Sequence, residues 1–239
     1  MHDGQAVVLA GGLATRMRPA TLTVPKSMLE VAGRPFVDWQ LERLAACGLT
    51  DVVMCVAHLA EVIEAHVGDG ARFGVRVRWA HEGPNLLGTA GAIRAALPML
   101  AETFLVTYGD SYLPFDYAEP LRILAAHGDC DGVMSAFPNR GAWDASNTEV
   151  DPSGAWVNRY EKGSSDPALD HIDYGATALR RGIIAALPAG ERHGLDAIQH
   201  DLARQRRLRA CIARERFFEI GSPGGLAELD RHLRTRAQS

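Results

Sequence analysis

Short apolar runs alternate with helical patterns along the first half of the chain. The apolar runs have the length of buried strands and lie at Ala6–Leu9, Asp51–Ala57, Val75–Ala80 and Phe104–Tyr108. Between them, apolar residues recur with the period of a helix at Pro35–Cys47, Leu59–Val67 and Thr89–Leu100. Strands that alternate with helices in this way predict right-handed βαβ units and a parallel sheet.

After about residue 130 the chain becomes richer in strand-like segments. Strands are predicted at Val133–Phe137, Glu149–Val150, Trp156–Tyr160, Ile172–Leu179, Leu208–Ile212 and Phe217–Ile220, and helices at Arg181–Leu187, Leu195–Arg204 and Pro223–Arg236. Ser222 stands directly before the last helix, where a serine is a favoured N-cap. We expect these strands to extend the same sheet. The predicted fold class is therefore α/β, a Rossmann-like three-layer α/β/α arrangement with a mostly parallel mixed sheet.

Composition narrows the classes of function. The chain has 239 residues, a hydrophobic fraction of 47% and a net charge of −4, so we expect no nucleic-acid partner, because nucleic-acid-binding domains usually carry a basic surplus. The four cysteines form no CxxC pair, which favours reduced thiols over a zinc site. The N-terminus is too polar for a signal peptide and no apolar run approaches a membrane span, so we expect a cytoplasmic protein with no membrane partner.

The first predicted strand runs directly into two glycines. The loop Leu9-Ala10-Gly11-Gly12 is followed by two cations, Arg16 and Lys26, the second of them directly after a proline. A glycine turn exposes backbone N–H groups that can cradle phosphate oxygens, and a triphosphate needs several donors and positive charges. Neither GxxxxGK[ST] nor GxGxxG occurs there, so the loop is not that of a P-loop NTPase or a dinucleotide-binding fingerprint.

The segment LAGGLATRMRPATLTVPKSMLEVAGRP, from Leu9 to Pro35, resembles the signature of sugar-1-phosphate nucleotidyltransferases, the nucleotide-diphospho-sugar pyrophosphorylases. The family pattern has LAGG, then glycine-threonine-arginine, PKxM and a GxP turn. Ala14 stands where the family usually has glycine. The resemblance implies transfer of a nucleotidyl group from an NTP to a sugar 1-phosphate, with release of pyrophosphate and with Mg²⁺ as the cofactor.

Two further motifs match the nucleotide side of the family. The segment EGPNLLGTAG, from Glu82 to Gly91, is similar to the motif that contacts the base, with a glycine at position 88 that lets a ligand come close. Asp110 ends an apolar strand, where α/β folds bind ligands, and in the family this aspartate holds Mg²⁺. The resemblance implies that the nucleotide is bound by Leu9, Ala10, Gly11, Gly12, Glu82, Gly88 and Thr89, with catalytic roles for Arg16, Lys26 and Asp110.

Motifs of the second half resemble the sugar side of the family. In the pair Glu161-Lys162, the resemblance implies that the carboxylate binds sugar hydroxyls and the ammonium binds the sugar phosphate. HIDYG occupies the place of the family's NxG segment, and FFEIGSP resembles its late DIGTP motif with glutamate in place of aspartate. The predicted sugar-phosphate wall is Asn147, Glu161, Lys162, Asp173, Tyr174 and Gly175, and the predicted Mg²⁺ ligands are Asp110 and Glu219.

The motifs together imply one domain over residues 1–239, with 1–130 as the nucleotide-binding half and 131–239 as the sugar-phosphate-binding half. Their run from GDSY to FFEIGSP is similar to that of heptose 1-phosphate guanylyltransferases. We therefore expect GTP as the nucleotide, with D-glycero-D-manno-heptose 1-phosphate or a related hexose 1-phosphate. Uridylyl, cytidylyl and thymidylyl transfer stay open, as does a homo-oligomer, and a non-catalytic nucleotide-sugar-binding protein is a remote alternative.

Overall fold

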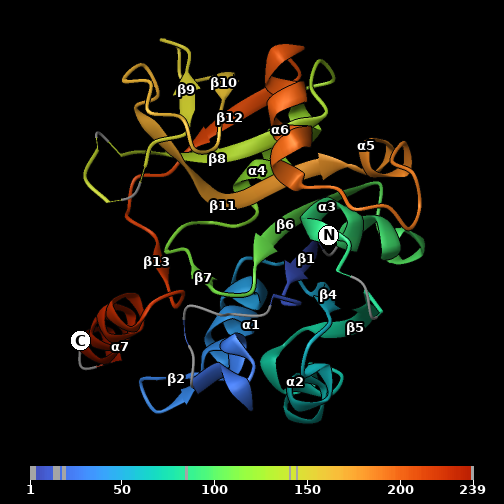
Figure 1. Ribbon diagram of the computed structural model, residues 1–239, viewed down its shortest axis with the longest axis vertical. Helices are drawn as coiled ribbons and strands as arrows, with labels where there is room; N and C mark the ends of the chain where they lie inside the picture. The colour runs from blue at the N-terminus through green and yellow to red at the C-terminus, as the bar shows by residue number, and fades with distance from the viewer. Residues whose placement is uncertain are drawn as a thin grey trace.

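A nine-stranded sheet forms the centre of the molecule (Figure 1). The computed structural model describes residues 4–12, 17, 20–83, 86–139, 141–143 and 145–237. The sheet consists of β1 (Gln5–Leu9), β4 (Asp51–Val56), β5 (Arg76–His81), β6 (Thr103–Tyr108), β8 (Gly132–Pro138), β9 (Thr148–Val150), β10 (Val157–Tyr160), β11 (His171–Arg180) and β12 (Leu208–Ile212). Strands of both sequence halves share this sheet, as predicted.

The first-half strands form a parallel unit in the order β6-β1-β4-β5. β11 then pairs antiparallel with β6 and with β8, and β12 lies parallel to β8 at that end. β9 and β10 pair antiparallel beside the start of β11. The sheet is thus mixed, with β11 and β10 running against the other strands, which confirms the predicted fold class.

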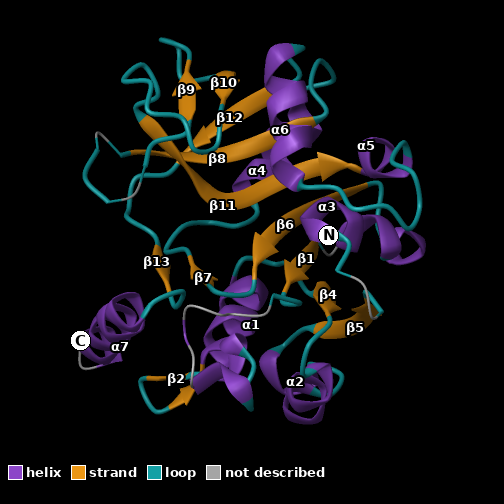
Figure 2. Ribbon diagram, in the orientation of Figure 1, coloured by secondary structure: helices purple, strands orange, loops and turns teal. Residues whose placement is uncertain are grey.

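Helices cover both faces of the sheet, so the molecule has three layers (Figure 2). One face packs on α1 (Phe36–Ala46), α2 (Ala60–Val67) and α4 (Glu119–Ala126), and the other on α3 (Gly88–Ala95), α5 (Arg181–Ala185) and α6 (Leu195–Arg204). Side chains of a strand alternate between the two cores: Val8 joins the first and Val7 the second, both fully buried. Burying each such side chain stabilises the fold by about 1.5–3 kcal/mol.

The C-terminal part departs from the prediction. Phe217–Ile220 was expected to extend the main sheet, but β13 (Phe218–Glu219) pairs instead with β7 (Ser111–Tyr112) in a separate two-stranded sheet. The helix α7 (Pro223–Ala237) packs beside it on a third, smaller core that includes Ile220 and Leu229. The Ser222 hydroxyl accepts a hydrogen bond from the N–H of Gly225 at 3.1 Å, which confirms the predicted N-cap.

Smaller differences have local causes. The predicted helix Thr89–Leu100 ends early, because Pro98 interrupts it and the chain continues as a 3-10 turn. Helix α4 and the short hairpin of β2 (Glu30–Val31) and β3 (Arg34–Pro35) were not predicted. The remaining 3-10 turns are Ala20–Leu22, Lys26–Met28 and Ala71–Phe73. The four cysteines are free thiols, as predicted, and in the described part of the chain no helix is long and apolar enough to cross a membrane.

Candidate active site

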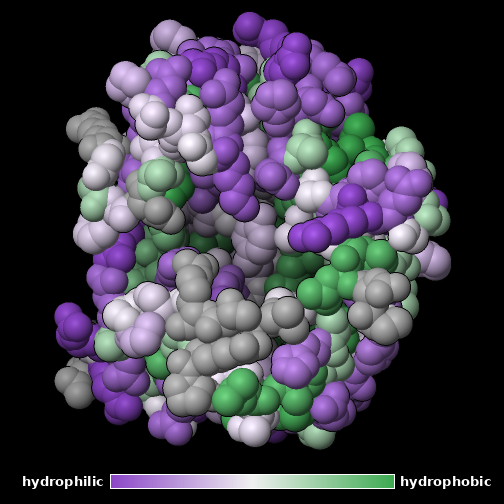
Figure 3. Space-filling view, viewed as in Figure 1, coloured by the Kyte–Doolittle hydropathy of each residue, from purple (hydrophilic) through white to green (hydrophobic). Residues whose placement is uncertain are grey.

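The carboxyl ends of β1 and β6 lie side by side, with Leu9 paired to Tyr108. From β1 the chain continues through α1 to β4 on one side, whereas β6 lies on the other side and borders β11. Adjacent parallel strands whose connections diverge leave a crevice, which is where open α/β sheets bind ligands. A cavity of about 240 Å³ opens there, and Figure 3 shows this face of the molecule hollowed across its middle. We call it the switch-point cavity.

The residues around this cavity come from distant parts of the chain. The lining consists of Leu9, Ala10, Gly11, Gly12, Lys26, Ser27, Glu82, Leu86, Gly88, Thr89, Ala92, Tyr108, Gly109 and Asp110. Every residue predicted to bind the nucleotide is among them, together with Lys26 and Asp110. The third predicted catalytic residue, Arg16, and the unusual Ala14 lie outside the described residues. The structure therefore brings the described part of the predicted nucleotide site together in one place.

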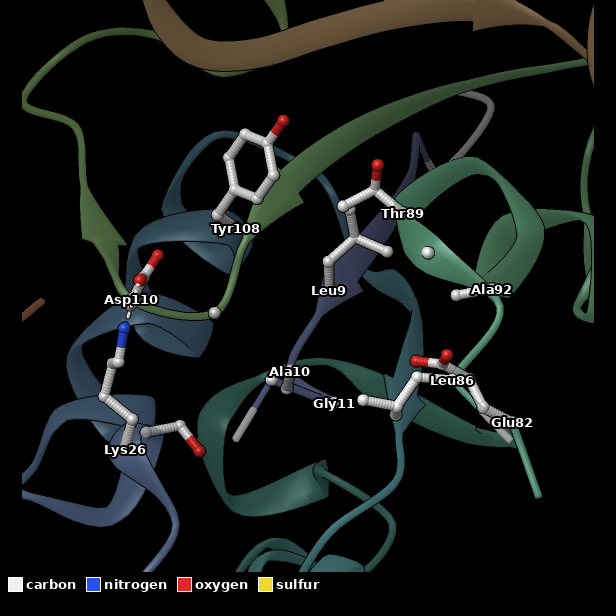
Figure 4. A pocket seen from close by; sticks show the side chains of 14 residues that line it. Leu9, Ala10, Gly11, Lys26, Glu82, Leu86, Thr89, Ala92, Tyr108 and Asp110 are labelled. Atoms are coloured by element: carbon white, nitrogen blue, oxygen red, sulfur yellow. Dashed lines mark hydrogen bonds and ion pairs between the residues drawn. The ribbon is translucent and has the colours of Figure 1, made fainter. Parts of the chain in front are cut away.

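One end of the cavity is charged. The Nζ of Lys26 lies 2.7 Å from the Oδ2 of Asp110 (Figure 4), although 84 positions separate them in sequence. Pro25, with φ −61° and ψ 149°, directs the chain into the short turn that presents the lysine. The other oxygen of Asp110 accepts a hydrogen bond of 3.3 Å from the Ser111 hydroxyl. This end thus offers an ammonium and a carboxylate to a ligand.

The two predicted metal ligands come from neighbouring chain segments. Glu219 pairs with Ser111 across the β13–β7 ladder, and the N–H of Ile220 donates to the carbonyl of Asp110 at 3.0 Å. Among the described residues, no group of three or more His, Cys, Asp or Glu side chains is arranged for a metal ion. Mg²⁺ needs only one or two protein carboxylates when phosphate oxygens and waters complete its shell. Asp110, which lines the cavity, is thus a suitable carboxylate for Mg²⁺ bound together with a phosphorylated ligand, and Glu219 follows on an adjacent backbone segment.

Glu82 and Leu86 lie at the other end of the cavity (Figure 4). An oxygen of Glu82 accepts a hydrogen bond from the N–H of Leu87 at 3.2 Å. Burial raises the pKa of the Glu82 carboxyl, and the Leu87 hydrogen bond partly opposes that shift. A Cβ at Gly11 would lie 2.5 Å from the Glu82 carboxylate, so a side chain at this position would displace the carboxylate from its place in the cavity.

Gly88 has a structural reason to be glycine in addition to the one predicted. Its φ is +72°, and a Cβ there would lie 2.6 Å from the carbonyl oxygen of His193. That oxygen caps the first turn of α3, accepting from the N–H groups of Ala90 and Gly91 at 3.0 and 3.2 Å. The hydroxyl of Thr89 accepts from the N–H of Leu195 at 2.7 Å. The close approach is thus made by the loop before α6, which joins the two halves at the rim of the cavity.

Residues of the predicted sugar wall are tied together by the backbone. The Asn147 side-chain oxygen accepts from the N–H of Asp173 at 2.8 Å, and the Asn147 carbonyl accepts from the N–H of Glu161 at the same distance. The pairing of β11 with β8 is interrupted after Asp173. Gly175 lies in this interruption with φ +91°, and its N–H donates to Asp173 at 2.9 Å. In this irregular part of the strand the Asp173 carboxylate thus bonds to the backbone of its own strand, at Gly175.

Glu161 and Lys162 are the charged pair of the predicted sugar wall. Arg159 donates to an oxygen of Glu161 from two of its nitrogens, at 3.2 and 3.0 Å, and also contacts Asp166 at 2.9 Å. Burial raises the pKa of the Asp173 carboxyl, and the positive charge of Lys162 partly opposes that shift. The Lys162 side chain is exposed. Arg159 therefore orients Glu161 without being one of the predicted ligands.

Tyr174 does not belong to the sugar wall, contrary to the prediction. Its side chain is 1% exposed and meets the rings of Phe115 and Phe217 edge to face, at 5.1 and 5.9 Å between centroids. Successive side chains of a strand point to opposite faces, so Asp173 faces the wall while Tyr174 packs into the core behind it. We therefore assign the Tyr174 ring a role in supporting β11.

Tyr108 and Gln199 are among the residues of the site that were not predicted from the sequence. Tyr108 precedes Gly109-Asp110 and lines the cavity with its ring. Burial raises the pKa of its hydroxyl, and the charges of Asp173, Asp110 and Asp196 raise it further, so this ring stands between the cavity and the predicted sugar wall. Gln199 is buried on α6 and hydrogen-bonds Asp173. A signal existed, because it lies four residues after Leu195 on the apolar face of that helix.

Comparison with known proteins agrees with this geometry. Residues 5–235 match the model of the family described as Nucleotidyl transferase. The chain belongs to this family, which confirms the resemblance carried by the motifs.

Individual relatives differ in the nucleotide and the sugar they are named for. The chain is 43% identical over 114 residues to N-acetylmuramate alpha-1-phosphate uridylyltransferase of Neisseria meningitidis serogroup B, which covers 47% of this chain and 49% of that protein. It is 30% identical to glucose-1-phosphate thymidylyltransferase of Streptomyces griseus, over 95% of this chain and 65% of that protein. The chain thus spans about half to two thirds of the length of these curated relatives.

Solved structures share the fold. HddC from Yersinia pseudotuberculosis, with one structure of it complexed with GMP-PN, superimposes with a TM-score of 0.77 at 24% identity, over 96% of this chain and 99% of that one. At this identity the likeness establishes the fold alone.

Proposed function

We propose that the chain transfers a nucleotidyl group from an NTP to a sugar 1-phosphate and releases pyrophosphate. The observation that carries the proposal is the switch-point cavity, with Lys26 and Asp110 at one end and Glu82 at the other. The first end has the charges that phosphates and a metal require, and the second has an acceptor for base N–H groups. The family membership of residues 5–235 supports the same reaction.

The proposed chemistry needs no general base from the protein. The second pKa of a phosphate monoester is about 6, so the sugar phosphate is mostly dianionic at neutral pH. One of its oxygens forms a bond to the α-phosphorus of the NTP. The bond from that phosphorus to the oxygen bridging the β-phosphate breaks, and pyrophosphate leaves with the electron pair. The protein has to bring two anions together, so its contribution is positioning and electrostatic stabilisation.

The charged residues divide this task. We assign Lys26 and Lys162 to the incoming phosphate, and Arg16 to the triphosphate. Asp110 and Glu219 would hold a Mg²⁺ ion, which when bound would neutralise charge on the phosphates. The ion pair of Lys26 with Asp110 balances the carboxylate when no ligand is present. On ligand binding the lysine is then free to turn to a phosphate.

The proposed division of the domain follows from these assignments. Residues 1–130 supply the switch-point cavity for the nucleotide, and residues 131–239 supply the sugar wall through Asn147, Glu161 and Asp173. Support comes from the hydrogen bonds that tie these wall residues together. Tyr108 lies between the two parts, so the reacting phosphates would meet near it. We keep a cytoplasmic location as part of the proposal, since the four free thiols suit a reducing compartment.

For the substrates we propose GTP with D-glycero-D-manno-heptose 1-phosphate or a related hexose 1-phosphate. The motifs of the second half and the GMP-PN complex of the Yersinia protein support a guanine nucleotide. The second candidate is uridylyl transfer, which the 43% identity with the Neisseria uridylyltransferase favours. Thymidylyl transfer has weaker support from the Streptomyces relative, and cytidylyl transfer has none from these proteins.

A pyrophosphate-release assay tests the proposal. Purified chain with Mg²⁺ is incubated with each of GTP, UTP, CTP and dTTP against mannose, glucose and heptose 1-phosphates. We expect release with GTP and a manno-configured sugar 1-phosphate. Faster release with UTP would replace the guanylyl assignment by the uridylyl one. No release with any pair, together with measurable binding of nucleotide sugars, would favour a non-catalytic binding protein.

A further inference from the structure

The Asp173 carboxylate is held by donors from three elements. The N–H of Gly175 donates to its Oδ1 at 2.9 Å, and the Gln199 amide donates to its Oδ2 at 3.3 Å. The hydroxyl of Tyr160, on β10, makes a further hydrogen bond with it. A carboxylate has about four acceptor positions, so three donors fix its orientation and leave room for one more donor. Asp173 as a residue keeps some exposure to solvent, so a ligand can approach it from that side.

Gln199 donates to this carboxylate from a buried position, where a polar side chain lowers the stability of the core. Its side chain is 1% exposed, and its amide also donates to the Thr177 hydroxyl at 3.0 Å. Among the described residues its Oε1 has no hydrogen-bond partner, and an unpaired buried oxygen destabilises a fold. An apolar side chain would suit this face of α6 better. The polar group therefore has a purpose at the site, which is to hold Asp173.

Most of the charged side chains that act on Asp173 and on the tyrosines beside it are acidic. Asp173 and Asp196 both act on the hydroxyls of Tyr108 and Tyr160, and Asp110 also acts on Tyr108. All these effects raise the pKa values of the two hydroxyls, as burial does. Lys162 is the described cation that acts on Asp173, and the proposed function commits that lysine to the sugar phosphate. The sugar ring would therefore meet fixed carboxylates and tyrosine hydroxyls.

We propose that Asp173, positioned by Gln199 and Tyr160, selects sugar 1-phosphates that present a hydrogen-bond donor here and excludes sugars with an acidic substituent. This inference rests on the proposed function and names its substrate class: neutral polyhydroxylated sugars or amino sugars. A hydroxyl or amine completes the acceptor set of Asp173, whereas a second carboxylate would face like charge in a partly dry site. N-acetylmuramate, for which the Neisseria relative is named, carries such a carboxylate and belongs to the excluded class.

The test compares one neutral with one acidic sugar of the same configuration. The rate constant kcat/KM for pyrophosphate release is measured with mannose 1-phosphate and with mannuronic acid 1-phosphate, at saturating NTP. We expect the wild-type chain to prefer the neutral sugar by at least about tenfold. Asp173→Asn replaces the charge by an isosteric amide, so it should bring this ratio close to one. Equal use of both sugars by the wild type, or an unchanged ratio in D173N, overturns the inference.

Gln199→Met tests the positioning role with a side chain of similar shape. We expect a higher KM for mannose 1-phosphate, roughly tenfold, with kcat changed less and the dissociation constant of the NTP unchanged. A variant that only loosens the fold would weaken the NTP as well, which would contradict a role at Asp173. Asp201→Asn is the matched control, because Asp201 lies on the same helix with a side chain that is 68% exposed; it should match the wild type.

A binding measurement separates this inference from the proposed reaction. If no pyrophosphate forms with any substrate pair, the proposed reaction fails. Calorimetric titration with the same two sugar 1-phosphates then decides the inference. Binding of mannose 1-phosphate that is at least about tenfold tighter than that of mannuronic acid 1-phosphate supports it. Equal affinities, or no binding of either sugar, overturn it.

Discussion

Lys26 lies 2.7 Å from Asp110 across the mouth of the switch-point cavity. The two side chains are 17% and 28% exposed, so both stay accessible to a ligand. The pair joins the segment after β1 to the end of β6, and its members are two of the three predicted catalytic residues. In the proposed reaction Lys26 would turn from the carboxylate to a phosphate, and Asp110 would then be available to hold the metal ion.

Replacing Lys26 should separate catalysis from folding. Lys26→Ala removes a positive charge that the proposed transition state uses, so we expect turnover to fall roughly 100- to 1,000-fold. The melting temperature should change little, because a partly exposed ion pair contributes little to stability. Steady-state pyrophosphate release and a thermal melt measure the two effects. Lys26→Arg keeps the charge in another shape and should lose less activity than the alanine variant; near-wild-type turnover of the alanine variant contradicts the assignment.

Removal of the metal should abolish the reaction. The two described carboxylates, Asp110 and Glu219, need phosphate oxygens to complete a Mg²⁺ shell, so metal and nucleotide should bind together. We expect excess EDTA to stop pyrophosphate release and to weaken nucleotide binding in a calorimetric titration. Asp110→Asn should raise the Mg²⁺ concentration needed for half-maximal activity, by roughly 10- to 100-fold. Full activity in EDTA would remove the metal from the account.

Glu82 should be a position where binding and stability conflict. Burial raises its pKa above the ordinary 4.5, so the ionised form destabilises the folded state relative to the unfolded one. That penalty is complete above the raised pKa and fades as the pH falls toward 4.5. Glu82→Gln should therefore raise the free energy of unfolding at pH 7, with no gain at pH values below the unfolded pKa.

The same substitution should weaken nucleotide binding. An amide keeps one oxygen for the Leu87 N–H but replaces the second acceptor by a donor, so we expect an affinity loss of roughly tenfold or more. Urea titrations at several pH values and nucleotide titrations at pH 7 measure the two effects. A variant that is less stable at pH 7 and binds as tightly as the wild type would refute the role of Glu82.

Alanine substitutions at two glycines of the site should differ in their effect on stability. Gly88→Ala adds a methyl 2.6 Å from the His193 carbonyl at a φ of +72°, so we expect a destabilisation of roughly 1–3 kcal/mol. Gly12→Ala meets nothing within 4 Å among the described residues and should leave stability nearly unchanged, while it weakens nucleotide binding at the phosphate loop. Urea unfolding and nucleotide titration of both variants check this contrast. Equal stability of the two variants would contradict the docking of the loop before α6.

Much of the fold could be predicted because its determinants are local. Each buried strand is an apolar run, and the motifs with chemistry follow the carboxyl ends of β1, β5 and β6. In a parallel sheet those ends share one edge, so residues as distant as Gly11 and Glu82 gather there. The features that could be learned only from the structure depend on residues that are distant in sequence. The segment Phe217–Ile220 lies outside the main sheet because it pairs with β7. Glycine is needed at position 88 because the His193 carbonyl lies against it.

The sugar wall was harder to predict for the same reason. The sequence HIDYG places an aspartate and a tyrosine side by side, and only one of two adjacent strand residues can face a site. Which of them does so depends on the interruption of β11 after Asp173 and on the aromatic cluster around Tyr174. Gln199 is contributed by a helix that follows β11 in the chain. No spacing within the β11 motif points to it.

The central claim is the joining of two phosphates, and one measurement tests it most directly. The purified chain is incubated with Mg²⁺, GTP and a manno-configured sugar 1-phosphate, and the products are followed by ³¹P NMR. The account predicts equal amounts of inorganic pyrophosphate and a sugar-linked diphosphate, formed only when both substrates are present. Pyrophosphate that appears without the sugar phosphate, or a mixture in which no sugar-linked diphosphate forms with any NTP, would contradict it.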